Sequence, residues 1–247
     1  MRSAPHPGWI VPDWPAAKRV RSLVTTRAGG SSSGSFSTLN LSLRVGDDPA
    51  RVAANRAVLR ACLPGDPAWM RQVHGTAVID PERATPQTEA DAQVTRRAGA
   101  VCAVMTADCL PVLLSDRAGS AVGIAHAGWR GLAAGVIEAA VRAIAARPGD
   151  LIAYLGPGIG PGRYEVGDDV RRTFVERDAA AARAFAAKGG GKYLADLYAL
   201  ARMRLAAAGI AEVHGGGFCT ASDERFFSFR RDRTTGRMAS LVWLEDH

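Results

Sequence analysis

The sequence has few cysteines, few aromatic residues and no long apolar run, and each shortage excludes a class of protein. Its 4 cysteines among 247 residues are irregularly spaced, which excludes a disulfide scaffold and favours reduced thiols. Two of them, Cys62 and Cys102, lie in apolar runs and are expected in the core. The longest apolar runs stop at roughly six to eight residues, far short of a membrane span. Since the first residues also lack the apolar core of a secretory signal, we expect a cytoplasmic protein with no membrane partner.

The basic charge does not indicate a nucleic-acid partner. The net charge is +7, but the arginines are spread along the chain and only short pairs occur, such as Arg96-Arg97 and Arg230-Arg231. Aromatic residues make up 6% of the chain, too few for extensive stacking on bases. No G-x-x-x-x-G-K-[ST] phosphate loop occurs, which argues against a nucleoside triphosphatase. What remains is a basic surface that attracts small anions.

Apolar runs and turn residues predict strands and helices that alternate irregularly. Short apolar runs flanked by Gly, Asp or Pro predict buried strands over 20–26, 101–105, 110–114, 121–125, 151–155 and 240–244. Helical periodicity and capping residues predict helices from Asp47-Asp48-Pro49 onward and over 131–144, 168–187 and 196–208. The glycine run 189–191 is a surface connection. With no linker and no repeat, we expect one α+β domain over residues 1–247, with mixed β-sheets flanked by helices.

One cysteine and two histidines stand in short, unusual contexts near the ends of predicted strands. These are Cys109 after Thr106-Ala107-Asp108, His126 before Ala127-Gly128-Trp129-Arg130-Gly131, and His74 in Arg71-Gln72-Val73-His74-Gly75. A thiolate and two imidazoles are the ligand set of a zinc site with an open fourth position. A cysteine with a histidine is equally the raw material of a thiol nucleophile. The spacing is not that of a zinc finger or ribbon, so the residues alone leave both chemistries open.

Polar residues beside the trio supply candidates for binding and proton transfer. Arg130 lies where a helix is expected to begin, and its guanidinium with the free backbone N–H groups there suits an anion. The glycines at that point suit a tight strand-to-helix turn equally well. Asp91, Asp108 and Glu165 are the carboxylates closest to these motifs, and an acid or base would come from among them.

With these motifs the chain resembles the YfiH-like, laccase-domain family of purine nucleoside phosphorylases, long labelled polyphenol oxidoreductases. The matching motifs follow the same order over nearly the full length: Thr25-Thr26-Arg27, Leu39-Asn40-Leu41, Val45-Gly46-Asp47, Gln72-Val73-His74-Gly75, Ala90-Asp91-Ala92, Thr106-Ala107-Asp108-Cys109, His126-Ala127-Gly128-Trp129-Arg130-Gly131, Gly156-Pro157, Ile159-Gly160, Tyr164-Glu165-Val166, Cys219-Thr220, Phe226-Phe227-Ser228 and Arg230-Arg231-Asp232. Family members often carry cysteines after Ile159-Gly160-Pro161. This chain has Gly162-Arg163 there, so those thiols are not required.

The resemblance implies a zinc site made of His74, Cys109 and His126, with copper as an alternative occupant. It implies phosphorolysis of adenosine, inosine and methylthioadenosine by inorganic phosphate, with adenosine deamination as a second activity. The implied fold is α+β and is shared distantly with a toxin that uses a Cys-His pair. On these motifs we assign catalytic roles to Asp91, Asp108 and Arg130, and substrate-binding roles to Asn40, Gln72, Gly128, Trp129 and Glu165. We expect a monomer or a small homo-oligomer.

Three rival functions differ in their chemistry. A multicopper oxidase is rejected, because 5 histidines with no His-x-His pair cannot supply the further copper centres that oxygen reduction needs. A thiol hydrolase with Cys109 as nucleophile and His126 as base stays open. A non-catalytic binding module with a structural metal is the third, although a core of this size does not need one metal to fold.

Overall fold

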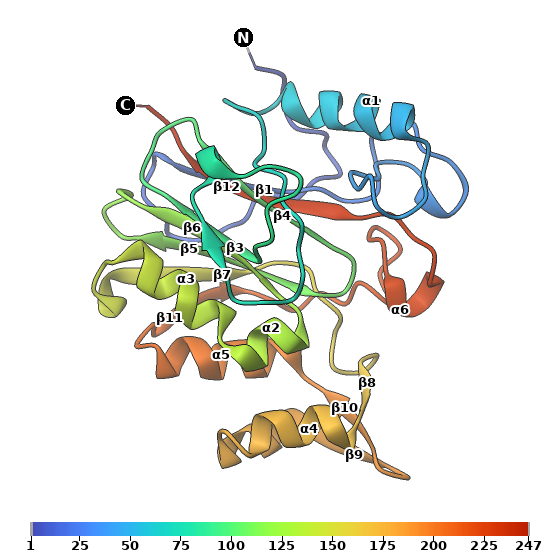
Figure 1. The fold of residues 1–247 in the computed structure, drawn as a ribbon, viewed down its shortest axis with the longest axis vertical. Coiled ribbons are helices and arrows are strands. Elements are labelled where there is room, and N and C mark those ends of the chain that lie inside the picture. Colours follow the sequence, from blue (N-terminus) through green and yellow to red (C-terminus); the bar gives the residue numbers. More distant parts are fainter. Residues whose placement is uncertain (1, 247) are drawn as a thin grey trace.

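The computed structural model describes residues 2–246, and its largest sheet has six strands in the order β11-β7-β5-β6-β3-β2 (Figure 1). The strands are β2 (Val78–Ile79), β3 (Ala92–Thr95), β5 (Leu110–Asp116), β6 (Val122–Ala127), β7 (Leu151–Leu155) and β11 (Glu212–Gly215). The β11–β7 and β2–β3 pairs are parallel, and the other pairs are antiparallel. β5, β6 and β7 are buried along their whole length, which is why their sequences are continuous apolar runs.

A second, antiparallel sheet packs against one face of the first. Its strands are β1 (Val20–Val24), β12 (Met238–Leu244) and β4 (Val101–Thr106), in that order. Val104 of β4 and Val242 of β12 share an apolar cluster with Leu113 and Ile124 of the large sheet. This packing buries both faces of the central strands, so their side chains are apolar without alternation.

Three helices cover the other face of the large sheet (Figure 1). They are α2 (Trp129–Ala134), α3 (Val136–Ile144) and α5 (Leu197–Ala207). The single helix predicted over 131–144 is wrong, because Gly135, with φ 103°, ends α2 and precedes α3. Glycine adopts this left-handed conformation at little cost, so the helix axis changes direction there.

A small sheet with one helix forms a separate layer, at the bottom of Figure 1. It contains β8 (Glu165–Gly167), β10 (Lys192–Ala195), β9 (Phe185–Gly189) and α4 (Asp168–Val175). The helix predicted over 168–187 is therefore wrong beyond Val175. The alanines favour a helix locally, but Phe185 is buried in the main core and residues 186–187 pair with β10. The glycine run 189–191 forms the β9–β10 turn, with positive φ at each residue.

Both predicted capping residues, Asp48 and Asp196, lie directly before a helix, as expected from the sequence. Asp48 precedes α1 (Pro49–Arg60) and accepts a hydrogen bond from the Ala50 backbone at 2.8 Å. Asp196 precedes α5 and accepts one from the Ala199 backbone at 2.9 Å. The other helical segments are α6 (Phe229–Asp232) and the 3-10 helices Gly34–Phe36, Pro81–Arg83, Pro148–Asp150 and Ala179–Ala184.

The α+β class, with mixed sheets flanked by helices, is confirmed. Cys102 is buried as predicted, but Cys62 is only half-buried and its sulfur lies 3.5 Å from the Ala4 carbonyl oxygen. Among the helices of residues 2–246, none combines the length and the apolar character needed to cross a membrane.

Candidate metal centre and active site

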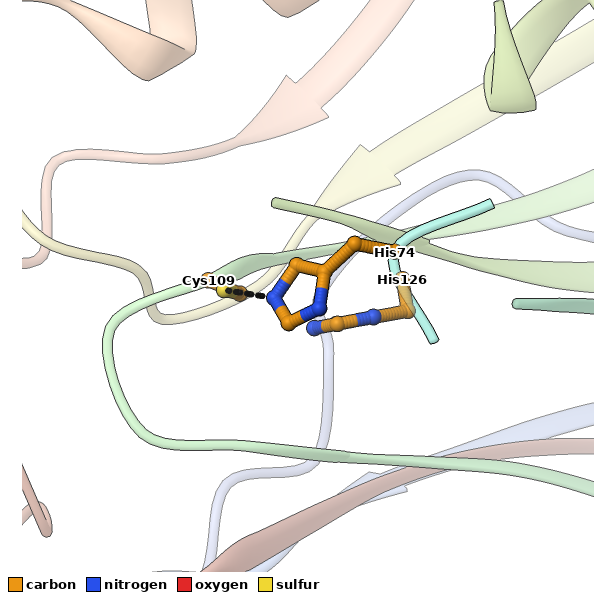
Figure 2. A group of neighbouring side chains, drawn as sticks. All are labelled: His74, Cys109 and His126. Carbon is orange, nitrogen blue, oxygen red and sulfur yellow. Dashed lines mark hydrogen bonds between the residues drawn. The ribbon is translucent and has the colours of Figure 1, made fainter. Parts of the chain in front are cut away.

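The cysteine and the two histidines meet at one end of the large sheet. His126 lies on β6, and Cys109 directly precedes the neighbouring strand β5, where Pro111 pairs with His126. His74 reaches the same point from the loop before β2 (Figure 2). The Cys109 Sγ atom lies 3.6 Å from His74 Nε2, and the two imidazole centroids are 4.7 Å apart. The potential ligand atoms of all three residues lie within 4.8 Å of one another.

One buried carboxylate orients both histidines. Asp91, directly before β3 and fully buried, accepts a hydrogen bond from His126 Nδ1 at 2.7 Å. It also accepts bonds of 3.1, 3.0 and 2.7 Å from the backbone N–H groups of Val73, His74 and Gly75. Burial raises the pKa of Asp91, but the bonds from His126 and the backbone outweigh it and lower that pKa below its usual value. Asp91 is not among the residues that line the cavity described below; its hydrogen bonds position the histidines, and its catalytic role stays a prediction.

Gly128 keeps the space between the ligands clear. It is the residue before α2, and a Cβ atom at this position would lie 2.6 Å from His74 Cδ2 and 2.9 Å from Cys109 Sγ. Carbon atoms do not approach this closely without displacing a neighbour. A side chain at this position would therefore push His74 and Cys109 apart.

The donor set fits a zinc ion. Zinc–sulfur and zinc–nitrogen bonds of about 2.3 and 2.05 Å at a tetrahedral angle imply a sulfur–nitrogen separation of about 3.6 Å. Cys109 Sγ and His74 Nε2 are 3.6 Å apart. A histidine ligand whose other nitrogen donates to a carboxylate is a frequent feature of zinc sites, and the His126–Asp91 pair supplies it. Within residues 2–246 this trio is the one group of its kind.

The same contacts form a chain of thiol, imidazole and carboxylate. Burial opposes ionisation of Cys109, but the neighbouring His126 and His74 outweigh it and lower the pKa of the thiol to about 6. Burial also opposes the charge on His126, but Cys109 and Asp91 outweigh it and raise the pKa of the imidazole to about 9. Without metal, the site therefore holds a thiolate–imidazolium pair at neutral pH. This is the arrangement of a thiol nucleophile, while the second histidine at the sulfur is an added metal donor.

The trio lines a cavity of about 510 Å³ that is rich in positive charge. Four arginines share the lining, namely Arg44, Arg130, Arg230 and Arg237. In the described part of the chain, none of these four forms a salt bridge. Arg230 and Arg237 donate instead to backbone carbonyl groups, and burial lowers the pKa of Arg237. Unpaired guanidinium groups in a concave site attract an anion.

Asp108 is the one carboxylate among the lining residues, and both of its oxygens are engaged. It accepts a hydrogen bond from the Thr220 hydroxyl at 2.6 Å and one from the Arg230 backbone at 2.6 Å. Its φ of 90° lies in the left-handed region, which is uncommon outside glycine. Asp108 thus lies at the cavity, where it ties the loop that carries Cys109 to the start of α6.

Trp129 and Gln72, both predicted to bind substrate, line the cavity. The Arg130 guanidinium lies over the Trp129 ring, 4.4 Å from its centroid. The Gln72 amide is committed elsewhere, since it donates to the Met105 carbonyl and accepts from the Met105 N–H, each at 2.8 Å. Gln72 therefore anchors the loop of His74 to β4.

Asn40 and Glu165, both predicted to bind substrate, are not among the residues that line the cavity. Asn40 is fully buried, and its amide bonds to Ser42, Asp47 and the Arg237 backbone. It joins the loop of Arg44 to the segment of Arg237. Glu165 forms a salt bridge of 2.5 Å with Lys188.

Among the lining residues that received no role from the sequence are three arginines and two aromatic residues, namely Arg44, Tyr164, Phe229, Arg230 and Arg237. Tyr164 and Arg230 stood in matched motifs without an assigned role. Arg44, Phe229 and Arg237 carried no signal, because single arginines and phenylalanines are common everywhere on a basic chain. Burial raises the pKa of Tyr164, and the Arg230 guanidinium lies 5.2 Å from its ring centroid.

Comparisons with known proteins agree along almost the whole chain. A family model described as multi-copper polyphenol oxidoreductase laccase matches residues 21–245. A purine nucleoside phosphorylase of Pseudomonas aeruginosa is 52% identical over 242 residues, covering 96% of this chain and 99% of the relative. The purine nucleoside phosphorylase YfiH of Escherichia coli is 50% identical over 239 residues, covering 95% and 98%. A crystal structure of a Neisseria meningitidis protein matches with a TM-score of 0.93 at 48% identity, covering 97% and 100%.

Proposed function

Because the chain belongs to the laccase-type polyphenol oxidoreductase family, with YfiH among its relatives, we propose that it is a purine nucleoside phosphorylase. Its substrates in this proposal are adenosine, inosine and methylthioadenosine, together with inorganic phosphate. The observation that carries the proposal is the meeting of a His-Cys-His group and four arginines without a salt bridge in one cavity of the described residues. In such a cavity the arginines can bind an anion such as phosphate, and the neighbouring polar groups can bind a nucleoside beside it.

His74, Cys109 and His126 would hold a zinc ion. When bound, zinc would act as a Lewis acid toward an oxygen of the substrate. Asp91 keeps the Nδ1 atom of His126 occupied, so that Nε2 faces the other two ligands. Copper at the same trio is the alternative occupant. A multicopper oxidase is not supported, because it needs further copper centres and the described residues contain one such group.

Phosphorolysis moves the ribose from a purine nitrogen to phosphate. A phosphate oxygen forms a bond to C1′ while the C1′–N9 bond breaks, and the departing purine takes up a proton. The reacting carbon becomes oxocarbenium-like, so an anion held beside it accelerates the step. Arg130 is our candidate for holding that anion, since its guanidinium lies at the cavity without a carboxylate partner.

Adenosine deamination is the second activity that we propose. Water replaces the amino group at C6 of adenine, and ammonia leaves. This reaction uses no phosphate, so it depends on the trio and on nucleoside binding but not on Arg130. The two reactions therefore separate the role of Arg130 from general damage to the site.

The test compares adenosine phosphorolysis and deamination over a phosphate titration in wild type and Arg130→Ala. Losing a bidentate charged contact should raise the KM for phosphate and lower kcat/KM for phosphorolysis by about 10- to 100-fold. Deamination should change much less. Arg142→Ala is the matched control, since Arg142 is exposed on α3 and does not line the cavity.

Each other outcome has a definite meaning. Equal loss of both activities would show that Arg130 supports nucleoside binding or structure. An unchanged phosphate dependence would remove Arg130 from the mechanism. A wild-type protein that performs no phosphorolysis would refute the proposed function.

A thiol hydrolase is the second candidate, because the Cys109 thiol lies close to His126, whose Nδ1 atom bonds to Asp91. Alkylation separates the two functions. A thiolate bound to zinc should react only after a chelator is added, whereas a free nucleophile should react at once. Cys102 provides an internal reference, since burial raises the pKa of its thiol and keeps it unreactive in both cases. A purely structural metal would instead unfold the domain on removal, and nucleosides would not shift the melting temperature.

A further inference from the structure

Phe229 is a large apolar side chain left exposed at the basic cavity. It is the first residue of α6, lines the cavity, and is 48% exposed. The two phenylalanines just before it, Phe226 and Phe227, are fully buried. An exposed phenylalanine lacks the stabilisation that burial gives to Phe226 and Phe227. Exposed apolar side chains beside a cavity are typical of a ligand-binding surface.

The ring of Phe229 also differs from the other aromatic rings of the cavity. Trp129 and Tyr164 are each covered by a guanidinium, 4.4 and 5.2 Å from their ring centroids. Among the described residues, neither a ring nor a cation lies against Phe229. Its aromatic face is therefore free to receive a flat partner.

The turn that carries Phe229 is held firmly in place. The Ser228 hydroxyl accepts a hydrogen bond from the Arg231 backbone at 3.2 Å, and the Arg231 guanidinium donates to the Thr220 and Phe226 carbonyl groups. The Arg230 backbone donates to Asp108, the residue before Cys109. The backbone that carries the ring is thus fixed relative to the His74–Cys109–His126 trio, as a positioning surface for substrate requires.

We propose that Phe229 stacks on the purine base and selects flat bicyclic bases over pyrimidines. The inference rests on the proposed function and deepens it. Ribose hydroxyl groups and phosphate suit the arginines and histidines of the cavity, whereas a base offers an apolar π-face that an uncovered aromatic ring can stack on. The fused bicyclic purine presents a larger π-face to Phe229 than a pyrimidine does, so the contact favours purines.

The experiment measures binding and turnover in wild type, Phe229→Ala and Phe229→Trp. In Phe229→Ala, the dissociation constant for free hypoxanthine, measured by calorimetry, and the KM for inosine should rise by about 5- to 150-fold, the range expected for one lost stack. Inhibition by ribose 1-phosphate and the KM for phosphate should stay unchanged. Phe229→Trp should restore purine binding, because it restores the aromatic face. Val58→Ala is the matched control, since Val58 is 45% exposed on α1 and outside the cavity.

The outcomes keep this inference separate from the proposed function. Wild type that binds hypoxanthine while Phe229→Ala binds it equally well would overturn the stacking role, whatever the turnover. Equal weakening of hypoxanthine and ribose 1-phosphate would overturn it too, because it would indicate a general distortion. Wild type that binds hypoxanthine without phosphorolysis would refute the proposed function and leave the stacking test valid. Wild type that binds no purine would overturn both.

Discussion

Replacing Asp91 by asparagine should separate metal binding from folding at this site. All four partners of the Asp91 carboxylate donate hydrogen: His126 Nδ1 and the His74 N–H to one oxygen, and the Val73 and Gly75 N–H groups to the other. Asparagine has the same shape but only one accepting oxygen. In either orientation of the amide, its NH₂ group faces two donors. If the NH₂ group faces His126, Nδ1 must become the acceptor and the proton moves to Nε2, where it blocks ligation.

The expected magnitude follows from the bonds lost. A hydrogen bond to a charged group contributes about 1.5–3 kcal/mol, so two lost bonds destabilise the metal-free protein by about 3–6 kcal/mol. Loss of an outer-shell partner of a zinc ligand typically weakens metal binding or activity by about 10- to 100-fold. Asp91→Asn should therefore show both effects.

The assay combines chemical denaturation of the metal-free protein with zinc titration against a competing chelator. Asp116→Asn is the matched control. Asp116 is also buried and accepts hydrogen bonds from the Ser120 and Ala121 backbones, at 2.7 and 3.0 Å, but it does not line the cavity. Because both backbone groups donate to the same oxygen, asparagine can keep these two bonds, so the variant should destabilise the fold less than Asp91→Asn and leave zinc affinity unchanged. Cys109→Ala sets the level of zinc binding without the thiolate.

The reasoning would be refuted if Asp91→Asn kept wild-type zinc affinity under conditions where it remains folded. It would also be refuted if Asp116→Asn lost zinc to the same extent, since the loss of zinc would then not depend on the contact with His126. Unchanged stability with lost zinc would show that the backbone bonds to Asp91 contribute little.

Two further predictions concern the same centre. Gly128→Ala should lose zinc while the protein stays folded, because the new methyl group would overlap His74 and Cys109; metal analysis with circular dichroism checks this, and stoichiometric zinc in the variant would contradict it. In metal-free protein, the rate of Cys109 alkylation should be half-maximal near pH 6, the lowered pKa of the thiol. Above this pH Cys109 is a reactive thiolate, and as the pH falls through this value the thiolate is protonated and the rate falls. His126→Ala should move this midpoint upward, since burial then dominates, and an unmoved midpoint would show that His126 does not stabilise the thiolate.

Strand positions and helix starts were predictable because each depends on few neighbours. A strand buried on both faces is apolar at nearly every position, and the continuous apolar run 110–114 therefore predicted the buried strand β5. Asp48 and Asp196 cap helices through bonds to residues two or three positions along the chain. Such contacts are local in sequence, so the sequence pattern predicts them.

The errors occurred where distant contacts outweighed local preference. The alanine-rich stretch after Val175 favours an α-helix, but Ala179–Ala184 forms a 3-10 helix, and from Phe185 onward burial and pairing with β10 give a strand. The amides of Asn40 and Gln72 likewise have distant partners, and through them they hold loops together. A polar residue in a motif is a candidate for a functional or structural role, but the sequence does not show which group it will hydrogen-bond.

The sequence by itself determined the kinds of donor at this centre: one thiol and two imidazoles, each near a strand end. Only the tertiary structure decided that they meet, because the pairing of β5 with β6 and of β3 with β6 brings together residues far apart in the chain. The same pairing places Asp91 beside His126, where its carboxylate bonds to the imidazole and orients it. The tertiary structure also decided that Arg237 and Phe229 share the cavity. The distance between two residues far from the trio in sequence is set only when the strands and loops pack together.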